Sequence, residues 1–286
     1  IESQLNDKKL IEEKSKKLES LATRLAKYLS PQIYKNIFDE EKDQSVSHSR
    51  KNLTVFFSDI VAFTDLTDKM EPEKLAAIIN SYLSEMSTIA IKYGGTIDKF
   101  IGDALMVFFG DPETLGEEQD ALRCLDMALK MKSRIEELRD YWNRNGVKGG
   151  LNVRMGISTG YCTVGNFGSN QRMDYTALGS PVNLSARLQS LADTNQIVIS
   201  DTTLNLVENK IIYEKFKEIT PKGFARPVQT YKLDDFIDQS ISKNKKSYSR
   251  KGKHVDINIF DTSNIKEALN ELEQLQDDFS KELNKD

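Results

Sequence analysis

Apolar residues near the start of the chain recur at the spacing of a coiled-coil seam. These positions are Ile11, Leu18, Leu21, Leu25 and Tyr28. They predict a helix over residues 1–29 that ends at Ser30-Pro31, because the residue before a proline disfavours the helical conformation. The same stripe would also suit a single amphipathic helix packed on its own domain. We therefore expect a helical stalk over residues 1–30, followed by a polar linker over residues 31–50.

Between residues 51 and 236, short apolar runs alternate with stretches of helical periodicity. The predicted helices are residues 72–93, 117–144 and 180–191, the last with Ser180 as its N-cap and Pro181 at its first position. The predicted strands are residues 53–57, 151–164, 196–200, 211–219 and 228–233, with a hairpin around Gly102-Asp103 and a loop at residues 165–168. A β-α-β-β-α-β order predicts an α+β, ferredoxin-like domain with its helices on one face of the sheet.

The remaining sequence predicts two appendages after this domain. Residues 237–263 are rich in Ser and Lys, which is typical of a solvated basic linker. Residues 264–286 carry apolar positions at helical spacing and predict an amphipathic C-terminal helix.

Composition narrows the class of protein. The chain has 286 residues, 29% of them charged, and a net charge of −4, so a nucleic-acid-binding role is not expected. No apolar run approaches the length of a membrane span, and Cys124 and Cys162 do not form a disulfide framework pattern. We expect a cytoplasmic enzyme module. Because the chain begins with Ile1, we expect it to be part of a longer protein.

Two carboxylates stand at the ends of predicted strands. Gly102 at a two-residue connection is a hairpin signal, so Asp103 is expected at an exposed tip. Asp59 follows the buried run 53–57. Carboxylates held by rigid β elements suit hard cations such as Mg²⁺, although either residue alone would also suit a turn.

The residues around these carboxylates resemble the signatures of class III nucleotidyl cyclases. The matching runs are Phe57-Ser58-Asp59-Ile60-Val61-Ala62-Phe63-Thr64 and Lys99-Phe100-Ile101-Gly102-Asp103-Ala104. The resemblance implies that a nucleoside triphosphate is cyclised with release of pyrophosphate, using two Mg²⁺ or Mn²⁺ ions per site. Asp59, Asp103 and the Ile60 carbonyl would hold the metal ions. Backbone amides as far as Phe63 and Thr64 would contact the β- and γ-phosphates.

A second group of residues matches the same family. Asn183 and Arg187 lie four apart on a predicted helix and share a face. The resemblance implies that they hold the ribose and the charge of the transition state, a task that suits a permanently charged guanidinium. Lys222 resembles a lysine that contacts the terminal phosphates; a surface lysine is the alternative.

Lys99 and Thr176 match the two positions that read the base. A lysine can donate to adenine N1, which carries no proton, and a threonine hydroxyl can accept from the 6-amino group. Threonine at the second position resembles the subgroup that includes cyanobacterial-type adenylyl cyclases. A guanylyl cyclase is the nearest alternative, disfavoured by Lys99.

The sequence therefore predicts an adenylyl cyclase module that converts ATP to cyclic AMP as a homodimer. An inactive nucleotide-binding module is the other alternative, which the presence of both Asp residues together with Asn183 and Arg187 disfavours. The resemblance also implies an upstream sensor or regulatory domain that acts through the N-terminal helix.

Overall fold

A computed structural model describes residues 2–26, 48–169, 171–221, 226–237, 248–251 and 256–259, together with residues 270 and 272. The chain divides into two compact units. The first comprises residues 1–208 and 213–234, and the second comprises residues 209–212 and 235–286. Of the helices described, none combines the length and the hydropathy that a membrane span requires.

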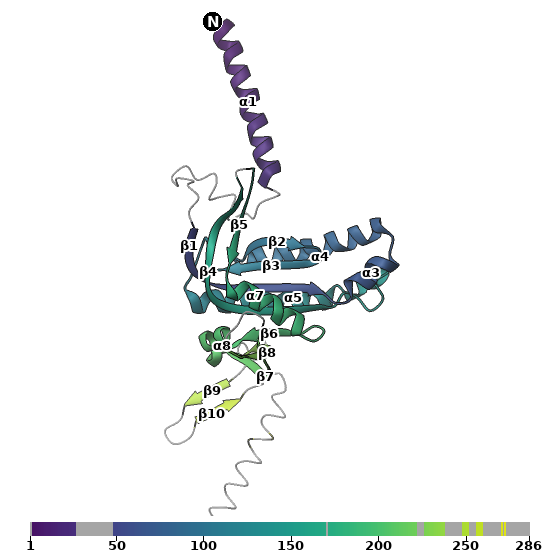
Figure 1. Cartoon of the computed structure of the whole chain (residues 1–286), viewed down its shortest axis with the longest axis vertical. Helices are drawn as coiled ribbons and strands as arrows, with labels where there is room; N and C mark the ends of the chain where they lie inside the picture. The colour runs from purple at the N-terminus through teal and green to yellow at the C-terminus, as the bar shows by residue number, and fades with distance from the viewer. Residues whose placement is uncertain are drawn as a thin grey trace, which may run out of the picture. The chain divides into compact units, whose positions relative to one another are not determined.

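An eight-stranded, mostly antiparallel sheet forms the centre of the fold (Figure 1). Its strands are β1 (His48–Ile60), β2 (Thr96–Ile101), β3 (Ala104–Phe109), β4 (Val153–Ser169), β5 (Arg172–Leu178), β6 (Ile197–Ser200), β7 (Ile211–Ile219) and β8 (Val228–Phe236). The order is β2–β3–β1–β4–β6–β8–β7, with β5 paired to β4. Among the strand pairs whose register the structure describes, β4 and β6 run parallel and the others run antiparallel. The first four strands of the chain, β1 to β4, lie in the sheet order β2–β3–β1–β4. With the helices that connect them, they form the βαββαβ unit that the sequence predicts.

The helices connect these strands. They are α1 (Glu2–Ala26), α3 (Phe63–Lys69), α4 (Pro72–Lys92), α5 (Glu117–Glu137), α6 (Arg139–Arg144), α7 (Ser180–Leu191), α8 (Asp201–Val207) and the short 3₁₀ helix η1 (Glu208–Lys210). The predicted helix 117–144 is therefore two helices, divided at Leu138. The helix predicted at 180–191 is present, but Gly179 and not Ser180 takes the N-cap position.

Helices cover both faces of the sheet. On one face, the Tyr82 hydroxyl of α4 lies 3.4 Å from Ser58 Oγ of β1. On the other face, Val182 and Ala186 of α7 pack against an apolar cluster. From β1 this cluster takes Leu53, Val55 and Phe57. Because successive strand residues point to opposite faces, the expectation that the helices lie on one face only was wrong: both faces of β1 are apolar enough to bury a helix.

The region after β4 also differs from its prediction. Residues 165–168, expected to form a loop, continue β4 and pair with β5. β5 itself was not predicted. Its register with β4 runs from Thr163↔Leu178 to Ser169↔Arg172, and the main-chain hydrogen bonds of this ladder hold the glycine-rich segment extended.

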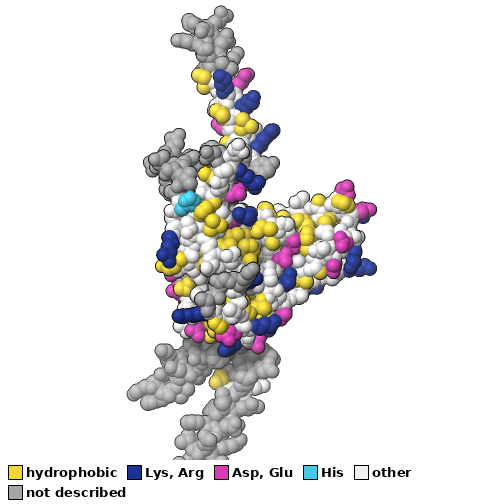
Figure 2. Space-filling view, viewed as in Figure 1, with side chains coloured by type: hydrophobic (Ala, Val, Ile, Leu, Met, Phe, Trp, Pro, Cys, Tyr) yellow, Lys and Arg dark blue, Asp and Glu magenta, His cyan; other side chains and the backbone are white. Residues whose placement is uncertain are grey.

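Residues 2–26 form the helix α1, and its predicted role as a coiled-coil stalk stays a prediction. The side chains of Ile11, Leu18 and Leu21 are exposed, and apolar side chains are visible along this helix in Figure 2. The Leu25 side chain, Tyr28 and the predicted helix end at residues 30–31 lie outside the described residues, as does most of the predicted C-terminal helix. Within the predicted basic linker, β9 (Tyr248–Lys251) and β10 (Asp256–Ile259) form an antiparallel pair.

Candidate active site

Asp59 lies at the end of β1, where it pairs in register with Arg154 of β4. Its side chain is 25% exposed. Asp59 Oδ2 accepts hydrogen bonds from Arg154 Nη2 at 3.0 Å and from Gln189 Nε2 of α7 at 3.3 Å. Neither partner was predicted from the sequence, because both come from elements far from Asp59 in the chain.

Asp103 lies in the predicted hairpin, which the structure confirms. Phe100↔Leu105 and Ile101↔Ala104 are the last pairs of β2 and β3, and Gly102 adopts φ +65° in the turn. Asp103 Oδ2 accepts a hydrogen bond of 3.0 Å from the Ile60 N–H. The turn is thereby fixed to the end of β1.

The structure brings the Asp59 and Asp103 carboxyl groups together. Burial, followed by a hydrogen bond with Asp59 and the negative charge of Asp59, raises the pKa of Asp103 to about 6. Burial and a neighbouring carboxyl group both disfavour the ionised form, which explains the direction of this shift. The pair therefore fits a divalent cation, which favours oxygen ligands.

Further ligands for a cation would have to include oxygen atoms other than carboxylates. Among the residues that the structure describes, no group of three or more His, Cys, Asp or Glu side chains could hold a metal ion. The predicted Ile60 carbonyl belongs to the residue whose N–H is already bound to Asp103. Its role as a metal ligand stays a prediction.

α7 is held unusually close to β4. A Cβ atom built on Gly156 would lie 2.2 Å from the main-chain nitrogen of Gln189 and 2.2 Å from the main-chain oxygen of Ser185, so only glycine fits here. Gln189 reaches Asp59 from this inner side of the helix.

The outer side of α7 carries Asn183 and Arg187. Both are exposed, while Leu184 and Leu188 between and after them are buried, as the helical spacing predicts. Arg187 makes no hydrogen bond or ion pair recorded within the described part of the chain. This face of α7 is therefore available to a ligand or to another chain.

Lys99 and Thr176 meet at a third residue, Asp98. Asp98 Oδ1 lies 3.3 Å from Lys99 Nζ, and Asp98 Oδ2 accepts a hydrogen bond of 2.5 Å from Thr176 Oγ1. Asp98 was not predicted as a site residue; the available signal was an acidic residue directly before Lys99 within a β-prone run. No recorded hydrogen bond or ion pair within the described residues joins this group to the Asp59–Asp103 pair or to Arg187.

The predicted phosphate-contacting residues have separate positions. Phe63 and Thr64 form the first turn of α3, four and five residues after Asp59, where helix amides lack intrahelical acceptors. Lys222 lies outside the described residues.

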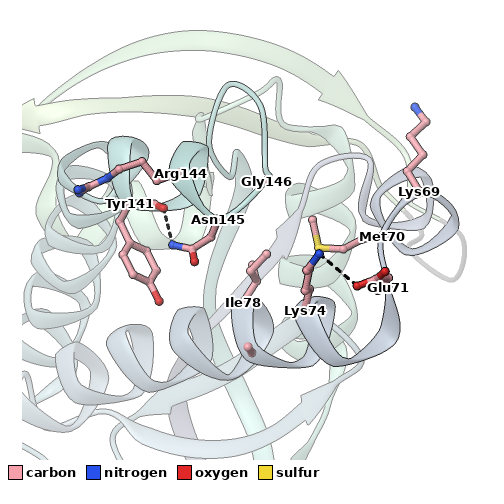
Figure 3. A pocket seen from close by; sticks show the side chains of 10 residues that line it. Lys69, Met70, Glu71, Lys74, Ile78, Tyr141, Arg144, Asn145 and Gly146 are labelled. Atoms are coloured by element: carbon pink, nitrogen blue, oxygen red, sulfur yellow. Dashed lines mark hydrogen bonds and ion pairs between the residues drawn. The ribbon is translucent and has the colours of Figure 1, made fainter.

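A cavity of about 590 Å³ lies between α4 and the α6 segment (Figure 3). Its lining includes Lys74 and Ile78 on α4 and Tyr141 and Arg144 on α6. It shares no residue with the predicted site. Lys74 is paired with Glu71 at 3.1 Å.

Known proteins similar to this chain include cyclases of both nucleotide types. The chain is 31% identical over 191 residues to the terminal-differentiation specific adenylate cyclase of Dictyostelium discoideum, covering 65% of this chain and 9% of that protein. It is 28% identical over 238 residues to the membrane guanylyl cyclase of the same organism, covering 82% and 15%. The chain thus spans a small part of the length of these relatives.

A solved structure and a family model match the region that contains the site. The crystal structure of the adenylyl cyclase CyaB from P. aeruginosa matches with a TM-score of 0.64 and 50% identity, covering 66% of this chain and 96% of that one. The model of the adenylate and guanylate cyclase catalytic domain matches residues 45–235, which contain every predicted site residue. The chain therefore belongs to the class III nucleotidyl cyclase family.

Proposed function

We propose that this chain is an adenylyl cyclase module that converts ATP to 3′,5′-cyclic AMP and pyrophosphate. The observation that carries the preference for ATP is the convergence of Lys99 and Thr176 on Asp98. A lysine donor and a threonine hydroxyl that contact the same carboxylate support this proposal, because the N1 and 6-amino edge of adenine pairs with one donor and one acceptor.

The proposed reaction is an in-line attack of the ribose 3′-hydroxyl on the α-phosphorus. Asp59, Asp103 and the Ile60 carbonyl would hold two Mg²⁺ or Mn²⁺ ions. When bound, such ions lower the pKa of an attacking hydroxyl and neutralise phosphate charge. Positioning and electrostatic stabilisation supply most of the acceleration in phosphoryl chemistry, so the protein's main task is to hold the substrate.

The remaining residues act on the substrate. Asn183 orients the ribose, and the Arg187 guanidinium stabilises the negative charge that develops on the phosphates. The main-chain amides of Phe63 and Thr64, together with Lys222, contact the β- and γ-phosphates.

We further propose that each site is shared between two copies of the chain. Asn183 and Arg187 are exposed on the outer side of α7, whereas Asp59 is reached from the inner side through Gln189. In a symmetric dimer, the aspartates of one copy would face Asn183, Arg187, Lys99 and Thr176 of its partner, giving two equivalent sites. Signals from an upstream domain would reach the dimer through α1.

Substrate and product identification tests the activity. The chain is incubated with ATP or GTP and with Mg²⁺ or Mn²⁺, and the products are identified by mass spectrometry. We expect cyclic AMP from ATP and much slower turnover of GTP, and we expect Lys99→Glu combined with a change at Thr176 to erode this preference. Equal use of GTP by the unmodified chain would contradict the assignment of Lys99 and Thr176.

Mixing two inactive variants tests the shared site. One variant carries Asp59→Asn and Asp103→Asn, and the other carries Asn183→Ala and Arg187→Ala. In a mixed dimer one site collects both defects and the other none, so random mixing restores roughly one quarter of all sites. Activity should return toward about a quarter of the unmodified rate. A mixture that stays inactive after a labelled subunit has demonstrated exchange would eliminate the shared-site arrangement.

A further inference from the structure

Asp98 is the extra residue of a bulge in β2. Ile97 pairs with Val107 of β3, and Lys99 pairs with the next residue, Met106, so Asp98 has no partner of its own in the ladder. In a regular strand Asp98 and Lys99 would point to opposite faces. A bulge changes the direction of a side chain, and here the two side chains come within 3.3 Å of each other.

The Asp98 carboxylate is buried, and its two oxygens differ within the described structure: Oδ2 accepts hydrogen bonds, whereas Oδ1 accepts none and forms an ion pair with Lys99. Its side chain is 0% exposed, whereas the Lys99 side chain is 41% exposed. Besides Lys99 and Thr176, the Ala177 N–H donates to Asp98 Oδ2 at 3.4 Å. Burial raises the pKa of Asp98, and the contacts with Thr176, Lys99 and Ala177 oppose that rise. A buried charge needs such partners, so this arrangement is costly to disturb.

These contacts determine which hydrogen-bonding groups face a ligand. A carboxylate only accepts hydrogen bonds, so Thr176 must use its one proton to donate to Asp98. The hydroxyl oxygen is left with lone pairs and can only accept from a ligand. Lys99 has three N–H donors and no acceptor, so a donor remains for the ligand after its contact with Asp98.

We propose that Asp98 is a specificity-determining positioning residue, which fixes Thr176 as an acceptor and Lys99 as a donor toward the purine. This pair complements the 6-amino group and the unprotonated N1 of adenine. It opposes a 6-oxo group with an acceptor and an N1–H with a donor, the edge that guanine and hypoxanthine present. The inference rests on the proposed use of ATP and adds the residue that enforces it.

Three nucleotides test the polarity of Thr176 in the unmodified protein. These are ATP, purine riboside triphosphate, which lacks the 6-amino group, and inosine triphosphate, which carries a 6-oxo group. We expect kcat/KM to fall at least about tenfold from ATP to purine riboside triphosphate, because one hydrogen bond is lost. It should fall further with inosine triphosphate. If inosine triphosphate is used better than purine riboside triphosphate, Thr176 donates to the base and the proposal is overturned.

Asp98→Asn tests whether Asp98 enforces this polarity. The introduced side-chain amide can donate a hydrogen bond to the Thr176 hydroxyl, which leaves the hydroxyl proton free to donate to a 6-oxo group. The ratio of kcat/KM for ATP to that for inosine triphosphate should therefore shrink at least about tenfold. In a Thr176→Val background, Asp98→Asn should change this ratio no further, because the hydroxyl through which it acts is absent. A ratio that stays within about twofold of the unmodified value in Asp98→Asn overturns the inference.

Asp111→Asn is the matched control. Asp111 is also a buried carboxylate that contacts a lysine and a hydroxyl, Lys51 and Tyr175, but it contacts no predicted site residue. Its variant should lower the melting temperature and leave the nucleotide ratio unchanged. A ratio that shrinks equally in Asp111→Asn would show a general loosening of the sheet and overturn the proposal.

The outcomes separate this inference from the proposed function. If the unmodified chain uses GTP as well as ATP, both fail. If it prefers ATP and Asp98→Asn retains that preference, only the inference about Asp98 fails. If Asp98→Asn does not fold, kcat/KM of Thr176→Val is measured with the same three nucleotides. A ratio of kcat/KM for ATP to that for inosine triphosphate that equals the unmodified value would show that the Thr176 hydroxyl does not determine specificity, and would overturn the inference.

Discussion

Gly156→Ala is predicted to separate α7 from the sheet. The added methyl carbon would lie 2.2 Å from two main-chain atoms of α7 and 2.8 Å from a third, the carbonyl carbon of Leu188. Ordinary Cβ contacts begin near 3.4 Å. Main-chain atoms cannot swing away as a side chain can, so the helix has to move as a body, by about 1 Å to restore normal contact distances.

This displacement should affect stability and activity together. Overpacking of a close-packed interior costs about 1–3 kcal/mol of unfolding free energy. For a domain of this size, each kcal/mol lowers Tm by about 2–4 °C. Because α7 carries Asn183 and Arg187 and positions Gln189 at Asp59, a misplacement of about 1 Å should also lower kcat by about 100-fold.

Calorimetry and steady-state kinetics measure these two effects. Ser158→Ala is the matched control, because Ser158 lies two residues along the same strand, is 1% exposed, and has a hydroxyl without a recorded hydrogen-bond partner in the described structure. That variant should keep Tm and kcat close to the unmodified values, since no hydrogen bond is lost. If Gly156→Ala melts and turns over like the unmodified protein, the close approach of α7 to β4 is refuted.

Three further predictions concern the metal pair and the stalk. Arg154→Gln removes a positive charge that contacts Asp59 and would compete with a metal ion for that carboxylate. The variant should therefore bind Mn²⁺ more tightly in titration calorimetry without nucleotide, and unchanged or weaker binding would contradict this competition. Asp103→Asn should stabilise the metal-free protein at pH 8 by about 1 kcal/mol after solvent screening and not at pH 3, because the folded-state pKa of about 6 exceeds the ordinary value of 3.8, so the stability present below pH 3.8 is lost as the pH rises to about 6. Urea unfolding at both pH values measures the difference, and an equal change at both would contradict it. Deleting residues 1–29 should weaken dimerisation or change the basal rate of cyclisation and leave the fold intact. If sedimentation and this rate are both unchanged, the N-terminal helix contributes neither to dimerisation nor to regulation.

Features encoded by neighbours in the chain were predictable. Gly102 and the two flanking β-prone runs define the hairpin that holds Asp103, and the four-residue spacing of Asn183 and Arg187 places both on the exposed side of α7. The helix in residues 2–26 follows from its composition and period. In each case the deciding interactions lie within about one turn or one hairpin.

Features that depend on distant pairing were not predictable. The bulge at Asp98 arises from the register between β2 and β3. The sequence of β2 alone does not determine which of its residues is left without a partner in β3. The contact of Gln189 with Asp59 requires α7 to cross β4 at Gly156, and β5 becomes a strand only through its ladder with β4. Only the assembled sheet brings these residues together.

The hairpin of β2 and β3 has a consequence for communication between sites. It carries Lys99 in its first strand and Asp103 in its turn, four residues further along. In the proposed dimer, Lys99 of one hairpin would serve one site and Asp103 of the same hairpin would serve the other. In that arrangement, a nucleotide bound to Lys99 at one site would displace the Asp103 carboxylate of the opposite site through the short, hydrogen-bonded hairpin. In the proposed dimer such a linkage would make the two sites cooperative, and the rate would then depend on ATP concentration along a curve that departs from a simple hyperbola.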